Sequence, residues 1–246
     1  MNELKHIDEF KAVLANYRPS TASLNTLSQT RLVLLVAPTS SGRNTAIREI
    51  MKTGDYYFVI SDTTRLPREN DGIMEQDGVE YWFRSEADML ADIKKGAFLE
   101  AAVIHEQQVS GISIRELQKA TELQKIAITD AEIAGVVNTI KYKPDTLAIF
   151  MVPPSFDEWQ RRLKHRGEMP PVEYRRRMES AILEFEAALS NDCYKFVIND
   201  TVEHAAEQVN RLAKLNEIDQ DLQSQARDKA QQLLLATREL VRSLSN

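Results

Sequence analysis

Residues 32–47 constrain the fold of this chain most strongly, because they combine an apolar run, a loop of small residues and the start of a helical pattern. Residues 32–36 contain only Leu and Val, which is typical of a parallel strand buried on both faces. A turn that leads directly into a helix points backbone N–H groups at a bound phosphate. The segment therefore predicts an α/β fold with an anion site after this strand.

The loop follows the phosphate-binding pattern G-x-x-x-x-G-K-[ST] over residues 37–44, with its key residues altered. Only the second glycine, Gly42, is intact. Arg43 stands at the position of the phosphate-binding lysine, and Asn44 stands where a hydroxyl that binds Mg²⁺ is expected. On these residues alone, an ordinary strand-to-helix turn remains the alternative.

Composition limits the classes of function. The 246 residues suffice for one α/β domain with extensions, and 31 Lys+Arg against 37 Asp+Glu give a net charge of −6. This charge gives no strong attraction to nucleic acid or to an anionic membrane. The single cysteine, Cys193, excludes an internal disulfide, and the four histidines lack ligand spacing. With no signal-like N-terminus and no membrane-spanning run, we expect a cytoplasmic protein without nucleic acid or membrane partners.

Periodic apolar residues divide the rest of the N-terminal part into elements. Three- and four-residue spacing predicts an amphipathic helix over residues 2–17, whereas residues 20–30 are small and polar and predict a linker. Residues 45–53 are expected to form the helix after the loop, and residues 56–60 the next strand.

Two arginines follow that strand at its carboxyl end, where ligands bind in open α/β sheets. Arg65 and Arg68 lie three residues apart, beside the hydroxyls of Thr63 and Thr64 and next to Pro67. Each guanidinium can hold an oxyanion with two parallel hydrogen bonds, so the segment predicts a phosphate clamp. A solvated basic loop is the alternative.

The order of these segments resembles the guanylate kinase family. Its S-x-T-T-R-x-P-R segment is matched over residues 61–68, and its acidic residue followed by D-G-x-D-Y-x-F is matched over residues 75–83, including Tyr81. A few extra residues lengthen the loop at 70–74. Residues 95–100 resemble G-x-F-x-E, whose glutamate, here Glu100, reads the guanine edge in the family. A carboxylate suits this role because it accepts two hydrogen bonds from adjacent N–H donors.

The next family motif, Tyr-Tyr-Gly-Ser/Thr, is changed at residues 108–113. Without a gap, Val109 replaces the tyrosine that holds the GMP phosphate, and Gly111 replaces the guanine-contacting hydroxyl. A one-residue shift, or substitution by Ser110 or Ser113, is the alternative.

Later motifs extend the resemblance to residues 31–215. Residues 126–135 match a strand that ends in D-x-D-x-Q-G, with Asp130 retained and Glu132 at the second aspartate. Residues 146–155 match the strand and turn before the lid. The lid pattern R-L-x-x-R-G supplies Arg162 and Arg166, and the following helix supplies Arg177. Residues 195–200 match the last strand, with Asn199 near the adenine.

The resemblance implies a P-loop nucleoside monophosphate kinase fold: a parallel sheet core, an inserted GMP-binding part at residues 61–111 and a lid at 162–177. It implies transfer of the γ-phosphoryl group of ATP to GMP with Mg²⁺. The implied GMP-binding residues are Ser61, Arg65, Arg68, Tyr81, Glu100 and Glu132. The implied ATP-binding residues are Ser40, Ser41, Gly42, Arg43, Asn44, Thr45 and Asn199. The implied catalytic residues are Arg43, Arg162, Arg166, Arg177 and Asp130, with Asn44 or Thr45 as the Mg²⁺ ligand.

The C-terminal part lies outside the resemblance. Apolar residues at three- and four-residue spacing predict one long helix over residues 216–243. Its stripe is expected to pack on the N-terminal helix or on the kinase body, with a homodimer through this helix as the alternative. The predicted domains are therefore an N-terminal helix and linker at 1–30, a guanylate kinase-like domain at 31–215 and a C-terminal helix at 216–246.

Two alternatives to GMP kinase activity remain. Arginine is longer and planar and need not replace the P-loop lysine, so the domain could have become a catalytically inactive module that binds GMP or a protein partner. Changes near Val109 and Gly111 fall in the acceptor pocket, so catalysis with a different acceptor is the second alternative.

Overall fold

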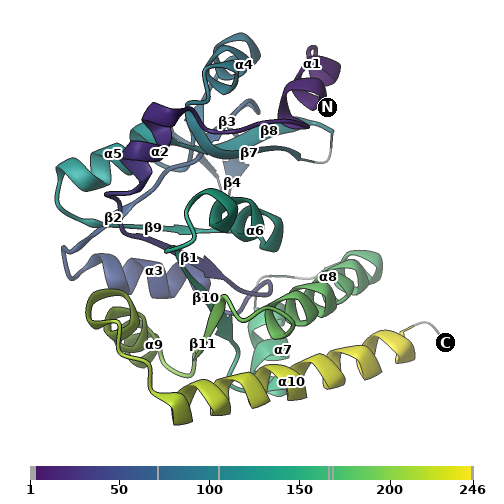
Figure 1. Cartoon of the computed structure of the whole chain (residues 1–246). Helices are drawn as coiled ribbons and strands as arrows, with labels where there is room; N and C mark the ends of the chain where they lie inside the picture. Colours follow the sequence, from purple (N-terminus) through teal and green to yellow (C-terminus); the bar gives the residue numbers. More distant parts are fainter. Residues whose placement is uncertain (1–3, 71, 105, 166, 168, 245–246) are drawn as a thin grey trace. The chain divides into compact units, whose positions relative to one another are not determined.

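The computed structural model describes residues 4–70, 72–104, 106–165, 167 and 169–244 (Figure 1). Contacts divide the chain into two compact units. Unit 1 comprises Met1–Leu32, Tyr57–Ala127 and Val137–Asp145, and unit 2 comprises Val33–Tyr56, Ile128–Val136 and Thr146–Asn246. The domain boundaries expected from the sequence remain a prediction.

A five-stranded sheet forms the core of the fold, with strand order β11-β10-β1-β9-β2. Its strands are β1 (Leu32–Val36), β2 (Tyr56–Phe58), β9 (Ile126–Asp130), β10 (Leu147–Val152) and β11 (Tyr194–Ile198). β1 pairs with β10, and β10 with β11, in parallel. Every residue of β1 is buried, as the unbroken apolar run predicts. The α/β fold class expected from the sequence is confirmed.

The helices of unit 2 lie between or after the strands of this sheet along the chain. They are α3 (Arg43–Met51), α7 (Phe156–Lys164), α8 (Pro171–Leu189), α9 (Val202–Asn210), a π-helical turn (Arg211–Leu215) and α10 (Gln220–Ser243). Phe150 on β10 makes an edge contact with Phe185 on α8, and Phe185 makes another with Trp159 on α7. These three buried rings join α7 and α8 to the sheet.

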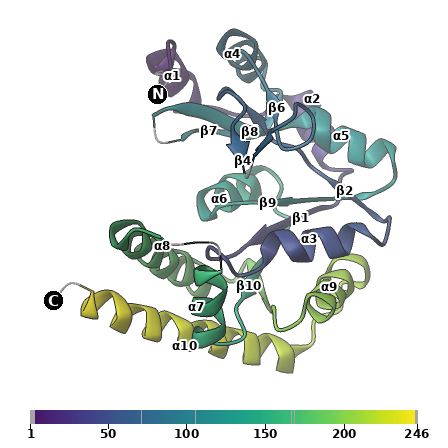
Figure 2. The same cartoon turned by 180° about the vertical axis from the view of Figure 1, so that it is seen from behind.

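The predicted C-terminal helix forms as α10 and lies along α8, as Figures 1 and 2 both show. Its stripe is buried at Ala226, Ala230, Leu233, Leu234 and Thr237. The side-chain amide of Gln223 accepts a hydrogen bond from Phe196 N and donates one to Phe196 O on the edge strand β11. The helix therefore packs on the kinase body of unit 2, one of the two intramolecular arrangements that the sequence allows.

Replacing Leu233 by aspartate is expected to lower the melting temperature by about 10 °C without changing the oligomeric state. Leu233 is 2% exposed, and the substitution removes its packing and buries a charge, a loss of about 3–5 kcal/mol. Calorimetry and light scattering measure both quantities, with Leu235→Asp as the control because Leu235 is 50% exposed. A wild-type dimer that Leu233→Asp converts to a monomer would instead support the homodimer.

Unit 1 is built on a four-stranded sheet with strand order β6-β3-β8-β7. The strands are β3 (Asp62–Thr63), β6 (Trp82–Phe83), β7 (Phe98–Ile104) and β8 (Gln108–Ser113), and a separate hairpin pairs β4 (Glu69–Asn70) with β5 (Ile73–Met74). The hairpin accounts for the extra residues seen in the sequence. The remaining helices are α1 (Ile7–Leu14), α2 (Thr21–Leu27), α4 (Glu86–Lys94), α5 (Ile114–Glu122) and α6 (Ile133–Tyr142).

The N-terminal segment differs from its prediction. α1 is shorter than the expected helix, whose first two residues lie outside the described part of the chain, and α2 forms where a linker was expected. Ser20 caps α2 by accepting a hydrogen bond from Ser23 N, and Ser23 Oγ donates to Gly96 O at 2.7 Å. A Cβ on Gly96 would lie 2.5 Å from Ser20 N, so the close approach requires glycine. Small polar residues therefore pack this helix tightly rather than forming a linker.

Among the residues that the structure describes, no helix is long and apolar enough to cross a membrane.

Candidate functional site

The loop after β1 has the geometry of a phosphate-binding loop. Gly42 adopts a left-handed conformation (φ 86°) at the N-cap of α3, and a Cβ there would lie 2.3 Å from Asn199 Nδ2. Side chains from other parts of the chain hold two backbone carbonyls of the loop. Trp159 Nε1 donates a hydrogen bond to Thr39 O at 2.8 Å, and Asn199 Nδ2 donates one to Ser41 O at 2.6 Å. The first N–H groups of α3 are therefore left at the mouth of a fixed loop.

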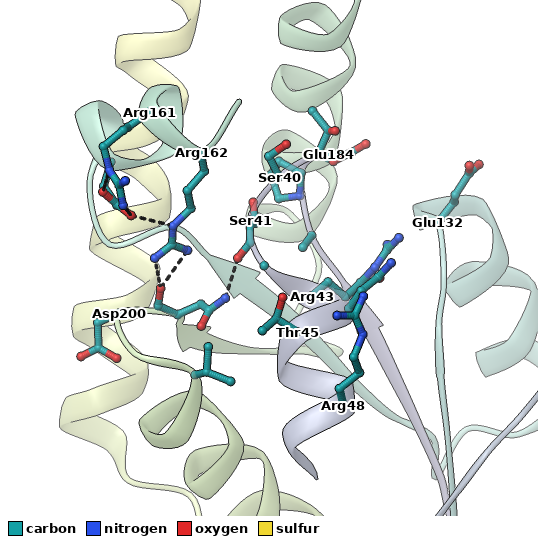
Figure 3. Close-up of a pocket in the computed structure, with 18 residues that line it drawn as sticks. Ser40, Ser41, Arg43, Thr45, Arg48, Glu132, Arg161, Arg162, Glu184 and Asp200 are labelled. Atoms are coloured by element: carbon teal, nitrogen blue, oxygen red, sulfur yellow. Dashed lines mark hydrogen bonds and ion pairs between the residues drawn. The ribbon is translucent and has the colours of Figure 1, made fainter. Parts of the chain in front are cut away.

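This loop forms one side of a pocket of about 620 Å³ in unit 2 (Figure 3). The pocket is lined by Ala37, Pro38, Thr39, Ser40, Ser41, Gly42, Arg43, Asn44, Thr45, Arg48, Glu132, Glu158, Arg161, Arg162, Glu184, Asn199, Asp200 and Val202. Every residue that the sequence assigns to ATP binding is in this set. We call it the donor pocket.

Arg43, at the lysine position of the motif, points toward the end of β9. Its Nη2 lies 2.8 Å from Asp130 Oδ2, and its Nη1 donates to Ala131 O at 3.4 Å. Both terminal nitrogens of the guanidinium are therefore bound within the protein. A phosphate in the donor pocket must compete with Asp130 for Arg43.

Arginines of α7 and α8 approach the loop from the other side. Arg162 donates from both terminal nitrogens to Asn199 O at 3.2 Å and from Nε to Glu158 at 2.8 Å. Hydrogen bonds from Arg161 and Arg162 lower the pKa of Glu158 to about 2. Arg177 donates to Thr39 Oγ1 at 3.4 Å and to Glu173 at 2.8 Å. The third predicted arginine of the lid, Arg166, lies outside the described residues.

Two candidate Mg²⁺ ligands, Asn44 and Thr45, are exposed at the start of α3 and line the donor pocket. Within the described ranges, no group of three or more His, Cys, Asp or Glu side chains is placed to hold a metal ion. An amide oxygen and a hydroxyl are the hard ligands that Mg²⁺ accepts, and one or two protein ligands suffice where phosphates supply the others. The residues present therefore fit Mg²⁺ bound together with a nucleotide.

Glu132, which the resemblance assigns to the acceptor, lines the donor pocket together with Glu184 of α8. The sequence analysis did not identify Glu184, because nothing in its spacing distinguishes it from the other charges of α8.

In unit 1, the sheet register determines which side chains share a face. Ser110 on β8 lies opposite Thr63 on β3 and Ala102 on β7, and Ser110 Oγ donates to Thr63 Oγ1 at 2.9 Å. Gln108 Nε2 donates to Ser110 Oγ at 3.2 Å. Because alternate residues of a strand share a face, Glu100 lies on the same face. We call this the hydroxyl face.

Val109 lies on the opposite face of this sheet and has no exposed surface. It belongs to the apolar cluster that contains Leu4, Phe10, Met89 and Phe98. In the ungapped interpretation, Val109 and Gly111 replace the family's tyrosine and hydroxyl, and both of these positions lie on the face away from Ser110. The one-residue shift places Gln108 and Ser110 on the hydroxyl face instead.

Arg65 is held in a closed arrangement beside this sheet. Its two terminal nitrogens donate to the two carboxylate oxygens of Glu75 at 2.5 and 2.8 Å, and both side chains are at most 10% exposed. The guanidinium lies 4.6 Å from the ring centroid of Tyr81, and Arg68 N also donates to Glu75. Arg65, Tyr81 and Arg68 are thus brought together, as the sequence predicts, with Arg68 exposed.

Asp62 was not identified from the sequence as a buried charge. It is fully buried and pairs with Arg84 at 2.7 Å and with Arg115 at 3.3 Å. These ion pairs hold β3, and hence the neighbouring Ser61 and Thr63, in place.

The five-stranded sheet and the donor pocket together are those of a P-loop nucleoside monophosphate kinase fold. Comparison with known proteins gives the family. The guanylate kinase family model matches residues 29–216. A guanylate kinase of Sulfurimonas denitrificans is 33% identical over 184 residues, 74% of this chain and 86% of that protein. One from Nocardia farcinica is 34% identical over 181 residues, 73% of this chain and 91% of the relative. This chain belongs to the guanylate kinase family.

Coverage differs among the relatives. Guanylate kinase 1 of Oryza sativa is 30% identical over 192 residues, and this chain spans 49% of its length. The crystal structure of a guanylate kinase from Anaplasma phagocytophilum superposes with a TM-score of 0.56 at 19% identity, covering 81% of this chain and 92% of that one. That similarity supports the fold alone. α1 and α10 lie outside the matched residues.

Proposed function

We propose that this chain is a cytoplasmic guanylate kinase that transfers the γ-phosphoryl group of ATP to GMP, giving ADP and GDP. The donor pocket is the observation that carries the proposal. There, a left-handed Gly42 at a helix N-terminus, the anchored Asn199 and Arg162 converge in one place. Phosphoryl transfer of this kind needs positioning and charge neutralisation rather than a covalent intermediate.

On the donor side, Gly42 and the N–H groups of residues 40–45 bind the ATP phosphates, and Asn199 lies beside the adenine. Arg43, Arg162, Arg166 and Arg177 neutralise charge on the transferring group. Asn44 or Thr45 holds Mg²⁺, with Asp130 acting through water. Mg²⁺ supplies neutralisation of the phosphate oxygens.

On the acceptor side, Arg65, Arg68 and Tyr81 bind the GMP phosphate, and Ser61 and Glu100 bind guanine or its phosphate. The hydroxyl face adds two residues to this set. Ser110 supplies the hydroxyl near guanine, and the Gln108 amide donates a hydrogen bond in place of the family's tyrosine.

One observation favours the inactive alternative: Arg43 is paired with Asp130 instead of facing the loop. A transfer assay with ATP, Mg²⁺ and a panel of nucleoside monophosphates separates the alternatives. Turnover with GMP supports the proposal, turnover with another monophosphate identifies a changed acceptor, and absence of turnover with every acceptor contradicts the enzyme.

Restoring the motif with Arg43→Lys and Asn44→Ser is expected to raise kcat about tenfold or more, since one transition-state contact is commonly worth about 10²-fold. Lysine reaches the phosphates as a point charge and is less suited to the two-point contact with Asp130 and Ala131. Steady-state kinetics measure the effect, with circular dichroism as the folding control. No gain in a folded variant would mean that Ala37 and the left-handed Ser40 (φ 61°) have reshaped the loop.

A further inference from the structure

Glu184 is an unexplained carboxyl group in the donor pocket. It projects from α8, and its Oε2 atom is buried without a hydrogen-bond partner in the described part of the chain. Ser40 Oγ, in the loop of the same pocket, is also buried and unpartnered (Figure 3). Ser41 Oγ and Arg43 Nε, which also line the pocket, are buried without a partner among the described residues as well. Buried polar atoms are rarely left unpaired, so four in one pocket indicate that a ligand completes their bonding.

Burial favours the neutral form of Glu184. Burial raises the pKa of Glu184 to about 7, Arg43 opposes the rise, and Glu132 adds to it. Arg43 is itself bound to Asp130 and Ala131 O, so its charge is already shared. The carboxyl group is therefore protonated in a large share of molecules near neutral pH.

Several charged side chains of the helices around the pocket form ion pairs with other residues of these helices. Arg161 and Arg162 of α7 hold Glu158, and Arg177 of α8 holds Glu173. From α10, Arg238 pairs with Glu186 of α8. The charged side chains lining the pocket besides Glu184 are Arg43, Arg48, Glu132, Glu158, Arg161, Arg162 and Asp200.

We propose that Glu184 binds the terminal phosphate of the donor nucleotide as a neutral carboxylic acid, donating its proton in a hydrogen bond to a phosphate oxygen. The inference rests on the proposed donor role of this pocket. An ionised carboxylate has no proton to donate and repels a phosphate, whereas the neutral acid is a donor. Arg43 must leave its ion pair with Asp130 before it can bind a phosphate. Protonated Glu184 can donate a hydrogen bond to the phosphate without breaking an ion pair.

Nucleotide binding is therefore coupled to proton uptake. Because the bound state needs the protonated acid, affinity is full below the pKa of the free pocket and falls as the pH rises above about 7. The fall approaches about tenfold per pH unit for one coupled proton.

Calorimetry with a non-hydrolysable ATP analogue tests this coupling, in buffers of different ionisation enthalpy between pH 6 and 8.5. Wild type is expected to take up a proton that Glu184→Gln does not, because glutamine carries a permanent N–H donor. Glu184→Gln keeps its affinity across the range, and Glu184→Ala loses about tenfold at pH 6.5. The difference between wild type and Glu184→Gln is the readout, since titration of the nucleotide's own phosphate is common to both.

Glu179→Gln is the matched control, because Glu179 is an exposed carboxylate on the same helix, paired with Arg175. It is expected to behave as wild type. Equal proton uptake by wild type and Glu184→Gln, or equal affinity of Glu184→Ala and wild type, overturns the inference. Proton-coupled binding without transfer to GMP supports the inference and contradicts the proposed function, and failure to bind the analogue at any pH contradicts both.

Discussion

Glu75→Ala is expected to lower the free energy of unfolding by about 3–5 kcal/mol. The carboxylate accepts two hydrogen bonds from Arg65 and one from Arg68 N, and both charged side chains are at most 10% exposed. Removing one partner of a buried ion pair leaves the other charge without compensation, and that cost exceeds the net gain that the pair provides. Urea denaturation measures the change.

The same substitution is expected to weaken GMP binding more than ATP binding. Glu75 fixes Arg65 over the ring of Tyr81, so its loss frees the guanidinium that we assign to the acceptor phosphate. Glu80→Ala is the control, since Glu80 is an exposed carboxylate that accepts a hydrogen bond from Gln76 N. A loss of stability below about 1 kcal/mol would show that the pair is worth no more than a surface ion pair.

Local patterns predicted the elements that carry the donor pocket. The apolar run of β1 and the start of α3 after Gly42 are set by neighbours in sequence, and the structure has both. The periodic stripe of α10, outside the pocket, was predicted in the same way. The family followed from the order of several motifs. Even there, the direction of Arg43 was not predictable, because its partner Asp130 lies 87 residues away along the chain, at the end of β9.

The acceptor side shows why sequence matching is weaker in strands. A slip of one residue moves every side chain of a strand to the other face of the sheet. Only the register, with Ser110 opposite Thr63, distinguishes the partly buried Gln108 and Ser110 positions from the fully buried Val109. The hydrophobic character of Val109 was one signal in the sequence that this position is buried, since valine is better suited to a core than to phosphate binding.

Tertiary packing accounts for the other differences. α2 carries few apolar residues and depends on Ser20 and Ser23, whose hydrogen bonds tie it to Gly96, far away in sequence. In the sequence, Glu184 cannot be told apart from the other charged residues of α8. In the folded chain, its Oε2 atom is buried without a hydrogen-bond partner among the described residues. Both features depend on neighbours that the sequence does not place beside them.

The acceptor assignment predicts a large effect at Glu100. Its strand β7 lies beside β8 in the sheet, and Glu100 shares the hydroxyl face with Ser110. A carboxylate there accepts hydrogen bonds from both the ring and exocyclic N–H groups of guanine, whereas adenine offers no such pair. Charge-assisted hydrogen bonds are worth about 1.5–3 kcal/mol each, so Glu100→Gln is expected to cut GMP affinity about 10- to 100-fold.

The preference of the protein for GMP over AMP should fall together with its affinity for GMP in the Glu100→Gln variant. Calorimetry with GMP and AMP is expected to show that Glu100→Gln relaxes the preference for GMP, because the amide no longer accepts both guanine donors, while ATP binding stays unchanged. Ser110→Ala removes a neutral hydroxyl from the same face and should cost less, about 1 kcal/mol. Because the arginines assigned to the phosphate are retained, GMP binding should remain measurable in both variants. A Glu100→Gln protein that binds GMP as wild type does, or a wild type that binds ATP and not GMP, would place the guanine site elsewhere.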